Sequence, residues 1–376
     1  MIKQAVILAA GSGTRMKDGT NDEYILSTPK PLLKVRGTPI IEKIVKRLNQ
    51  SGIEIGIVIN PKDESLFREA LKNYNILYYY QNEPKGTAHA LFSAKEFVTQ
   101  DMFLVQMGDD VSNFDIDDLL KTDVPMIFGF STEQLKEYGS IKLDKDGYAE
   151  MIIEKKISGP GIANCGIYVM PKEFFKIYDK ILPNQTNGEF YLTEAVNLLY
   201  EFKRPLFYKK LEFWTGINRL KDLENENTFH RSELKIRPAK MIDIYSLVFL
   251  LSQLSSVSYN YISLENVKRK LEAILLEKNT LIIVAEYHGD ILGTATLLLQ
   301  NNLSHGGRPY AHIENVVTRE DVRGFGIGLT MINELIKNAK EKDCYKIVLT
   351  CKPENIEFYR RNGFNPSGEV EMRLDL

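Results

Sequence analysis

Residues 8–17 of the chain read Leu-Ala-Ala-Gly-Ser-Gly-Thr-Arg-Met-Lys. They continue an apolar stretch, residues 4–10, that is typical of a buried strand and runs straight into the glycine pair beginning at Gly11. Such a loop lets backbone N–H groups approach a phosphate, while Arg15 and Lys17 supply positive charge. The spacing fits neither a Gly-x-Gly-x-x-Gly fingerprint nor a P-loop. Two glycines alone are equally well explained by an ordinary strand-to-helix turn.

The residues that follow alternate between short apolar strands and amphipathic helices. Apolar residues from Ile40 to Leu48 recur at helical spacing, and residues 53–59 and 103–107 are further strand candidates, the second ending at Asp109. Strands separated by helices of this length predict right-handed crossovers and an α/β, Rossmann-like domain with a mostly parallel sheet. Ligands of such sheets bind beyond the carboxyl ends of the strands.

A domain boundary is expected within the polar segment 222–236. After it, strands over 281–285 and 292–299 flank a turn at residues 288–290, which indicates a β-hairpin. We therefore predict an α/β domain over residues 1–232 and a second domain of class α+β with antiparallel pairing over residues 233–376.

Composition excludes several classes of protein. The 376 residues include 48 Lys and Arg against 50 Asp and Glu, a net charge of -2 that gives no basic footprint for nucleic acid. No apolar run approaches the ~20 residues of a membrane helix, and no signal peptide is expected. Three widely spaced cysteines and five scattered histidines offer no zinc site. These features predict a cytoplasmic chain that contacts neither nucleic acid nor membrane.

Further motifs follow the first loop in a characteristic order. They are Thr28-Pro29-Lys30-Pro31-Leu32-Leu33, the stretch from Gln81 to Ala90, Gly108-Asp109, Tyr138-Gly139, Ile153-Glu154-Lys155, Asn164-Cys165-Gly166, Gly188-Glu189-Phe190 and Gly216-Ile217-Asn218. With the opening loop, they resemble the sugar-1-phosphate nucleotidylyltransferases over residues 3–220. Enzymes of that family let a sugar phosphate attack the α-phosphorus of an NTP, with release of pyrophosphate.

The resemblance implies a role for each matched residue. Arg15 and Lys30 would be catalytic, acting on the pyrophosphate and on the α-phosphate. Asp109 and Asn218 would hold Mg²⁺, a hard ion that prefers carboxylate and carbonyl oxygens. Substrate-binding positions would be Gly11 in the phosphate loop, Gln81, Gly86 and Thr87 at the base, and Gly139, Glu154 and Asn164 at the sugar.

The matched motifs do not agree on which nucleotide and which sugar the first domain uses. Asn218 resembles the UDP-N-acetylglucosamine branch of the family, which predicts UTP and N-acetylglucosamine 1-phosphate. The Pro-Lys-Pro-Leu-Leu stretch after Thr28 resembles the thymidylyl and mannose branches instead. Another NTP with another hexose 1-phosphate therefore stays an alternative, as does a non-catalytic module that binds nucleotide and regulates its neighbour.

A second glycine motif lies near the C-terminus. Residues 316–328 read Val-Val-Thr-Arg-Glu-Asp-Val-Arg-Gly-Phe-Gly-Ile-Gly and precede an amphipathic helix. The pattern Arg323-x-x-Gly326-x-Gly328 resembles the pyrophosphate loop of GNAT acetyltransferases, whose N–H groups bind the diphosphate of coenzyme A. A glycine-rich helix start that serves only packing is the alternative.

The flanking residues make the resemblance more specific. From Ile236 onward the chain is similar to glucosamine-6-phosphate N-acetyltransferase, including the stretches 311–317 and 355–364. The resemblance implies acetyl-CoA as acetyl donor, Tyr359 as the acid for the leaving thiolate, and a homodimer through this domain. Cofactor-binding positions would be Val316, Val317, Arg323, Gly324, Gly326, Ile327, Gly328 and Asn355, and substrate-binding positions Ser255, Glu314 and Asn315.

Two departures from the acetyltransferase family affect the acceptor amine. Asn315 and Thr350 stand where the family usually has Asp, so a protein or another small amine stays an alternative acceptor. The whole chain is predicted to be a bifunctional enzyme of amino-sugar nucleotide synthesis, acting on NTP, sugar phosphates and acetyl-CoA.

Overall fold

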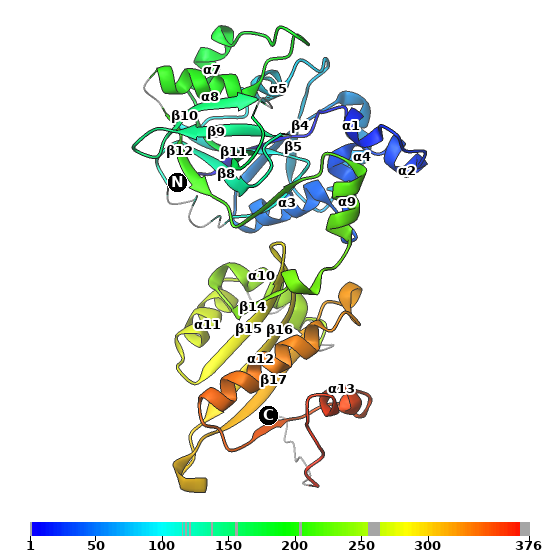
Figure 1. Cartoon of the computed structure of the whole chain (residues 1–376), viewed down its shortest axis with the longest axis vertical. Coiled ribbons are helices and arrows are strands. Elements are labelled where there is room, and N and C mark those ends of the chain that lie inside the picture. Colours follow the sequence, from blue (N-terminus) through cyan, green and yellow to red (C-terminus); the bar gives the residue numbers. More distant parts are fainter. Residues whose placement is uncertain are drawn as a thin grey trace. The chain divides into compact units, whose positions relative to one another are not determined.

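The computed structural model describes residues 2–114, 116, 119, 122–136, 138–154, 157–202, 205–254 and 264–368. Ser255, predicted to bind the acceptor's phosphate, lies outside them. The chain divides into two compact units, Met1–Thr228 and Phe229–Leu376, shown together in Figure 1. None of the described helices is long and apolar enough to cross a lipid bilayer.

The first unit alternates strands and helices. Its described strands are β1 (Gln4–Leu8), β2 (Lys34–Val35), β3 (Thr38–Pro39), β4 (Glu54–Ile59), β5 (Ile76–Tyr80), β6 (Met102–Met107), β7 (Asp110–Asn113), β8 (Met126–Thr132), β9 (Gly139–Leu143), β10 (Ala149–Glu154), β11 (Gly161–Pro171), β12 (Phe207–Lys210) and β13 (Phe213–Gly216). Its described helices are α1 (Thr14–Lys17), α2 (Glu23–Ser27), α3 (Ile40–Gln50), α4 (Glu64–Ala70), α5 (Thr87–Ser93), α7 (Phe174–Ile177), α8 (Leu192–Glu201) and α9 (Leu220–Asn227), with short 3-10 turns such as η1 (Lys30–Leu32).

The main sheet has the order β10-β9-β11-β6-β1-β4-β5. Its centre is parallel, because β1 pairs in parallel with both β4 and β6, and β4 with β5. Antiparallel pairs begin at β11, which runs against β6, β8 and β9. The predicted parallel α/β domain is confirmed at the strands that lead into Gly11 and Asp109.

Helices cover both faces of this sheet, which explains why its central strands are apolar throughout. α3 buries Ile41, Ile44, Val45 and Leu48 against one face, as their helical spacing predicted. Apolar residues of α5, α7 and α8 pack on the other face. Each such side chain contributes about 2 kcal/mol by leaving water, so the two cores hold the carboxyl ends of β1 and β6 in a rigid frame.

The second unit is α+β. Its described strands are β14 (Lys235–Pro238), β15 (Thr280–Tyr287), β16 (Asp290–Gln300), β17 (Tyr310–Thr318) and β18 (Ile347–Leu349), and its described helices are α10 (Ile244–Leu251), α11 (Leu264–Leu276), α12 (Ile327–Glu341) and α13 (Ile356–Arg360). The sheet order is β14-β15-β16-β17-β18, antiparallel except for the pair β17–β18. The predicted hairpin is present: Tyr287 pairs with Asp290 across a two-residue turn in which both residues have positive φ.

Candidate active sites

The glycine loop after β1 packs on Lys30. Gly13 has φ +63° and caps α1, and a Cβ built on it would lie 3.3 Å from the Cβ of Lys30. Gly11 has open space around it, and the side chain of Arg15 is exposed on α1. The loop therefore offers free backbone next to two cations, as a phosphate site requires.

Lys30, Asp109 and Asn218 meet at one point of the first unit. The Nζ of Lys30 donates to the Oδ2 of Asp109 at 2.5 Å and to the Oδ1 of Asn218 at 3.4 Å. The Lys30 side chain is only 9% exposed, so its charge acts with little screening by water. The structure thus brings together three of the residues that the nucleotidylyltransferase resemblance named.

A short two-stranded ladder holds Asp109 and Asn218 in place. β7 and β13 pair antiparallel, so that Asp110, next to Asp109, lies opposite Gly216, two residues before Asn218. The Nε1 of Trp214 donates to Asp110 at 3.3 Å. Burial, reinforced by the charge of Asp109, raises the pKa of the Asp110 carboxyl well above its usual range. The sequence motifs did not predict this supporting carboxyl, although it directly follows Asp109.

The donor set around Lys30 fits Mg²⁺. Asp109 offers a carboxylate and Asn218 an amide oxygen, the oxygen ligands that this ion prefers. Within the part of the chain that the structure describes, no group of three or more His, Cys, Asp or Glu side chains could hold a metal. A site of two protein ligands suits Mg²⁺, which commonly completes its shell with water and substrate phosphates.

Gln81 lies at the centre of the predicted base site. Its Nε2 donates to the carbonyl of Gly86 and to the Nδ1 of His89, each at 3.0 Å. Burial, with a smaller effect of Lys85, lowers the pKa of His89, which keeps its Nδ1 available as an acceptor. The hydroxyl of Thr87 accepts the backbone N–H of Leu192, at the start of α8. His89, which was not predicted, therefore orients Gln81, and Thr87 ties α5 to α8.

The predicted sugar residues gather on three strands. Gly139 on β9 lies opposite Glu154 on β10, and a Cβ at Gly139 would come 3.3 Å from the Oε1 of Glu154. Asn164 on β11 donates through Nδ2 to the hydroxyl of Tyr168 at 2.7 Å, across an irregular turn of the strand. Burial raises the pKa of Tyr168, so this hydroxyl stays protonated. The small residue at 139 leaves room above the Glu154 carboxylate.

In the second unit, β17 contains a bulge at Asn315. Thr294 pairs with Val317 and Thr296 with Glu314, so two residues of β17 face one of β16. Asn315 has φ +55°, in the left-handed region that Asn tolerates better than most residues. The bulge changes the direction of the backbone at Val316 and Val317, which were predicted to bind the cofactor.

The pairing of β17 with β18 ends just before the bulge. Their parallel pairing ends at Ile313 and Leu349, whereas β17 continues to Thr318. Beyond this point, the described residues of β18 make no pair with Val316 or Val317. Val316 and Val317 therefore have no strand partner on the β18 side among the described residues.

The glycine motif before α12 serves two purposes. Gly324 and Gly326 have φ +89° and +81°, which only glycine adopts readily. A Cβ at Gly328 would lie 3.0 Å from the Cζ of Phe358, so this glycine allows α12 and α13 to pack closely. Ile327 is buried and Arg323 is exposed at the loop. The packing explanation accounts for Gly328, whereas the first two glycines shape the loop itself.

Tyr359 lies on α13, and its ring makes edge-on contacts with the rings of Phe358 and Phe364. Burial raises the pKa of its hydroxyl, and Cys351 adds to the effect. Tyr359 is therefore a phenol at neutral pH and can give up a proton. Asn355, which precedes the helix, is exposed.

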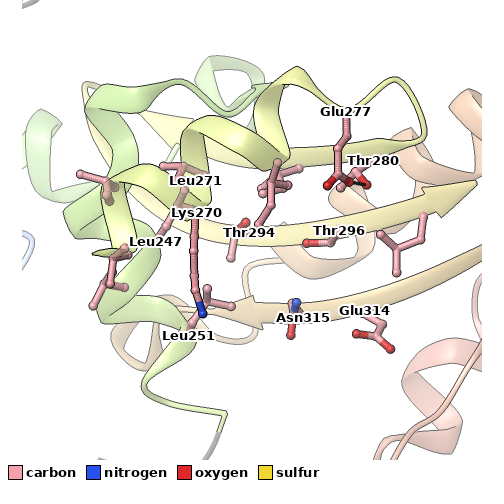
Figure 2. Close-up of a pocket in the computed structure, with 16 residues that line it drawn as sticks. Leu247, Leu251, Lys270, Leu271, Glu277, Thr280, Thr294, Thr296, Glu314 and Asn315 are labelled. Atoms are coloured by element: carbon pink, nitrogen blue, oxygen red, sulfur yellow. Dashed lines mark hydrogen bonds between the residues drawn. The ribbon is translucent and has the colours of Figure 1, made fainter. Parts of the chain in front are cut away.

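A cavity of about 290 Å³ opens between α10, α11 and the sheet of the second unit (Figure 2). Both Glu314 and Asn315 line it, so it borders the bulge. Thr350 is exposed and does not line it. The described residues that line it are Ile244, Leu247, Val248, Leu251, Val267, Lys270, Leu271, Ile274, Glu277, Thr280, Ile282, Thr294, Thr296, Leu298, Glu314 and Asn315.

The two units correspond to two known families. Residues 4–233 match the Nucleotidyl transferase family, and residues 248–364 match the Acetyltransferase (GNAT) family. The chain carries a nucleotidyltransferase domain and a GNAT acetyltransferase domain, and proteins similar to it are enzymes named for both activities.

Two curated relatives illustrate the similarity. The Bifunctional protein GlmU of Thermodesulfovibrio yellowstonii is 34% identical over 208 residues, which are 51% of this chain and 44% of the relative. The Bifunctional sugar-1-phosphate nucleotidylyltransferase/acetyltransferase of Sulfurisphaera tokodaii is 30% identical over 220 residues, 57% of this chain and 52% of the relative. The chain spans about half the length of the curated relatives it matches.

The solved structure of a UDP-glucose pyrophosphorylase complexed with UDP-glucose has a TM-score of 0.51 and 20% sequence identity. It covers 60% of this chain and 97% of that one. This likeness concerns the fold alone.

Proposed function

The chain belongs to the nucleotidyl transferase family, and from this premise we propose that its first unit joins a nucleoside monophosphate to a sugar 1-phosphate. The observation that carries the proposal is the contact of Lys30 with both Asp109 and Asn218. We propose UTP as the nucleotide and N-acetylglucosamine 1-phosphate as the sugar, because Asn218 resembles that branch of the family.

The reaction is an in-line displacement, in which the sugar phosphate attacks the α-phosphorus and pyrophosphate leaves. Lys30 neutralises charge that develops on the α-phosphate, and Arg15 binds the departing pyrophosphate. Mg²⁺, when bound by Asp109 and Asn218, supplies further neutralisation of phosphate charge. Gln81, oriented by His89, presents its amide to the base, while Glu154 and Asn164 orient the sugar.

The second unit is proposed to acetylate glucosamine 6-phosphate. The amine nitrogen attacks the thioester carbonyl of acetyl-CoA, the C–S bond breaks, and the amine proton passes to water, from which Tyr359 recovers the proton that it gives up. Tyr359 gives its proton to the leaving thiolate, since its hydroxyl is uncharged and half-buried. Backbone N–H groups of Val316 and Val317 stabilise the oxyanion, and the loop of Arg323, Gly324 and Gly326 binds the diphosphate of the coenzyme.

The two proposed reactions are not consecutive. The acetylated product carries phosphate on C6, whereas nucleotidyl transfer needs it on C1. A phosphate-moving mutase reaction must therefore lie between them. We further expect a cytoplasmic location and a homodimer through the second unit.

One panel of assays on the full chain tests both halves. Pyrophosphate release is measured for UTP, dTTP, GTP and CTP against several hexose 1-phosphates, and thiol release from acetyl-CoA against glucosamine 6-phosphate. Asp109→Asn should abolish pyrophosphate release and leave thiol release unchanged. Pyrophosphate release with another NTP but not with UTP would reject UTP as the nucleotide. No pyrophosphate release with any pair of substrates would favour a regulatory module that only binds nucleotide.

A further inference from the structure

The cavity beside the bulge has one wall of apolar side chains and one polar edge. α10 and α11 supply most of the apolar wall, with two residues from the strands: Ile244, Leu247, Val248, Leu251, Val267, Leu271, Ile274, Ile282 and Leu298. Its volume of about 290 Å³ is at the small end of ligand sites. Such a wall suits the C–H face of a single sugar ring. The hydroxyls of that sugar must then point toward the polar edge of the cavity.

Charges in the lining are few and separated. Among the described residues of the lining, Lys270 on α11 is the one cation, against the carboxylates of Glu277 and Glu314. Glu277 accepts the hydroxyl of Thr280 at 2.6 Å. Figure 2 shows the Lys270 side chain reaching from α11 toward the strand of Asn315, while Glu277 and Thr280 lie together away from it. Among the described residues, Lys270 has no carboxylate partner.

Resting on the proposed acetyl transfer, we propose that Lys270 binds the phosphate of the acceptor and determines its specificity for phosphorylated amines. An acceptor whose amine lies at Glu314 and Asn315, next to the acetyl site, places its body along the apolar wall. Of the lining residues that the structure describes, Lys270 alone then offers a cation to a dianionic group. The ammonium acts as a point charge at the cavity's exposed edge, where a phosphate keeps part of its hydration.

The test measures binding of two probes to the full chain by isothermal titration in the presence of coenzyme A. The probes are glucosamine 6-phosphate and glucosamine, which differ only in the phosphate. We expect Lys270→Gln to weaken glucosamine 6-phosphate binding on the order of tenfold, as for the loss of one exposed charge-assisted contact, and to leave glucosamine binding unchanged. Lys268→Gln, on the same helix outside the cavity lining, is the matched control and should change neither.

Three results would overturn the proposal: a wild-type chain that does not prefer the phosphorylated probe, an unchanged affinity in Lys270→Gln, or an equal loss for both probes. Melting temperatures check that the variant folds. Thiol release is recorded in parallel. Phosphate-selective binding that depends on Lys270 without thiol release would leave this subsite standing and reject the acetyl transfer.

Discussion

Lys30 and Asp109, 79 positions apart in the sequence, form an ion pair in which Nζ lies 2.5 Å from Oδ2. The pair joins η1, which packs on the glycine loop after β1, to Asp109 just beyond β6, and ligands of a parallel sheet bind at such strand ends. Asp110, the next residue after Asp109, is buried. The Lys30 ammonium therefore supplies the positive charge beside two neighbouring carboxyl groups. The same ammonium is proposed to act on the α-phosphate, so we expect stability and catalysis to depend on the same residue.

Replacement of Lys30 should therefore lower both the rate of nucleotidyl transfer and the stability of the first unit. Lys30→Gln is expected to lower nucleotidyl transfer by about a hundredfold or more, because a positioned charge on the α-phosphate is lost. It should also lower the free energy of unfolding by about 1–3 kcal/mol, because the Asp109 carboxylate loses its partner. Pyrophosphate release and urea unfolding measure the two effects. Lys34→Gln, exposed on β2, is the control, and equal effects of both variants would contradict the prediction.

Gly86 should not tolerate a side chain. It has φ +92°, and a Cβ there would lie 2.5 Å from the carbonyl oxygen of Phe190. Gly86→Ala is expected to destabilise the first unit by about 3 kcal/mol and to displace the carbonyl that Gln81 binds. Gly52→Ala, at φ +70° with no atom within 4 Å, should cost only about 1 kcal/mol. Urea unfolding of the two variants compares these costs; a similar loss in both would reject the steric argument.

His89 should give the first unit a pH-dependent stability. The pKa of His89 in the folded chain lies below its ordinary value of 6.5. Near pH 6.5, the imidazole is therefore protonated more often in the unfolded chain than in the folded chain. This contribution is present above 6.5 and is lost as the pH falls through the lowered pKa. Unfolding free energies at about pH 7.5 and about pH 5.5 should therefore differ less in His89→Asn, whose amide oxygen can replace Nδ1. An unchanged difference would exclude His89 as the source, and His305→Asn, exposed in the second unit, is the control.

The sequence predicted the frame of the first site better than its details. The apolar strands that lead into Gly11 and Asp109 were enough to predict a parallel sheet, in which the carboxyl ends of these two strands lie at the same edge. The ladder between Asp110 and Gly216 was not predictable, because β7 and β13 are four residues each and lie about a hundred positions apart. Such short strands have no periodic signal of their own, and only their pairing partner defines them.

In the second unit, too, the sequence predicted the main strands but not the details of the site. Its hairpin followed from a turn between two apolar runs, whereas the bulge at Asn315 did not. A residue with positive φ inside a strand has no sequence signal when it is Asn rather than Gly. Lys270 was missed for another reason: in an amphipathic helix, a lysine at a cavity edge has the same pattern as one on a solvated face.

Tyr359 is expected to act through its hydroxyl alone. Tyr359→Phe keeps the ring contacts with Phe358 and Phe364 and removes the proton that the leaving thiolate needs. We expect kcat for acetyl transfer to fall about a hundredfold, with KM for acetyl-CoA unchanged. Steady-state thiol release separates the two constants. Tyr310→Phe is the control, and a fall in affinity for acetyl-CoA at constant kcat would assign the hydroxyl to binding instead.

Asn315 allows the roles of backbone and side chain to be separated. Its φ of +55° suits glycine better than any other residue, so Asn315→Gly should keep the bulge and leave the unfolding free energy equal or higher by a few tenths of a kcal/mol. Asn315→Val, β-branched and strained at positive φ, should cost about 2 kcal/mol. If the bulge serves to aim the N–H groups of Val316 and Val317, thiol release survives in the glycine variant and fails in the valine variant. If the Asn315 amide itself binds the acceptor, both variants lose acetyl transfer, and the glycine variant does so with its stability intact.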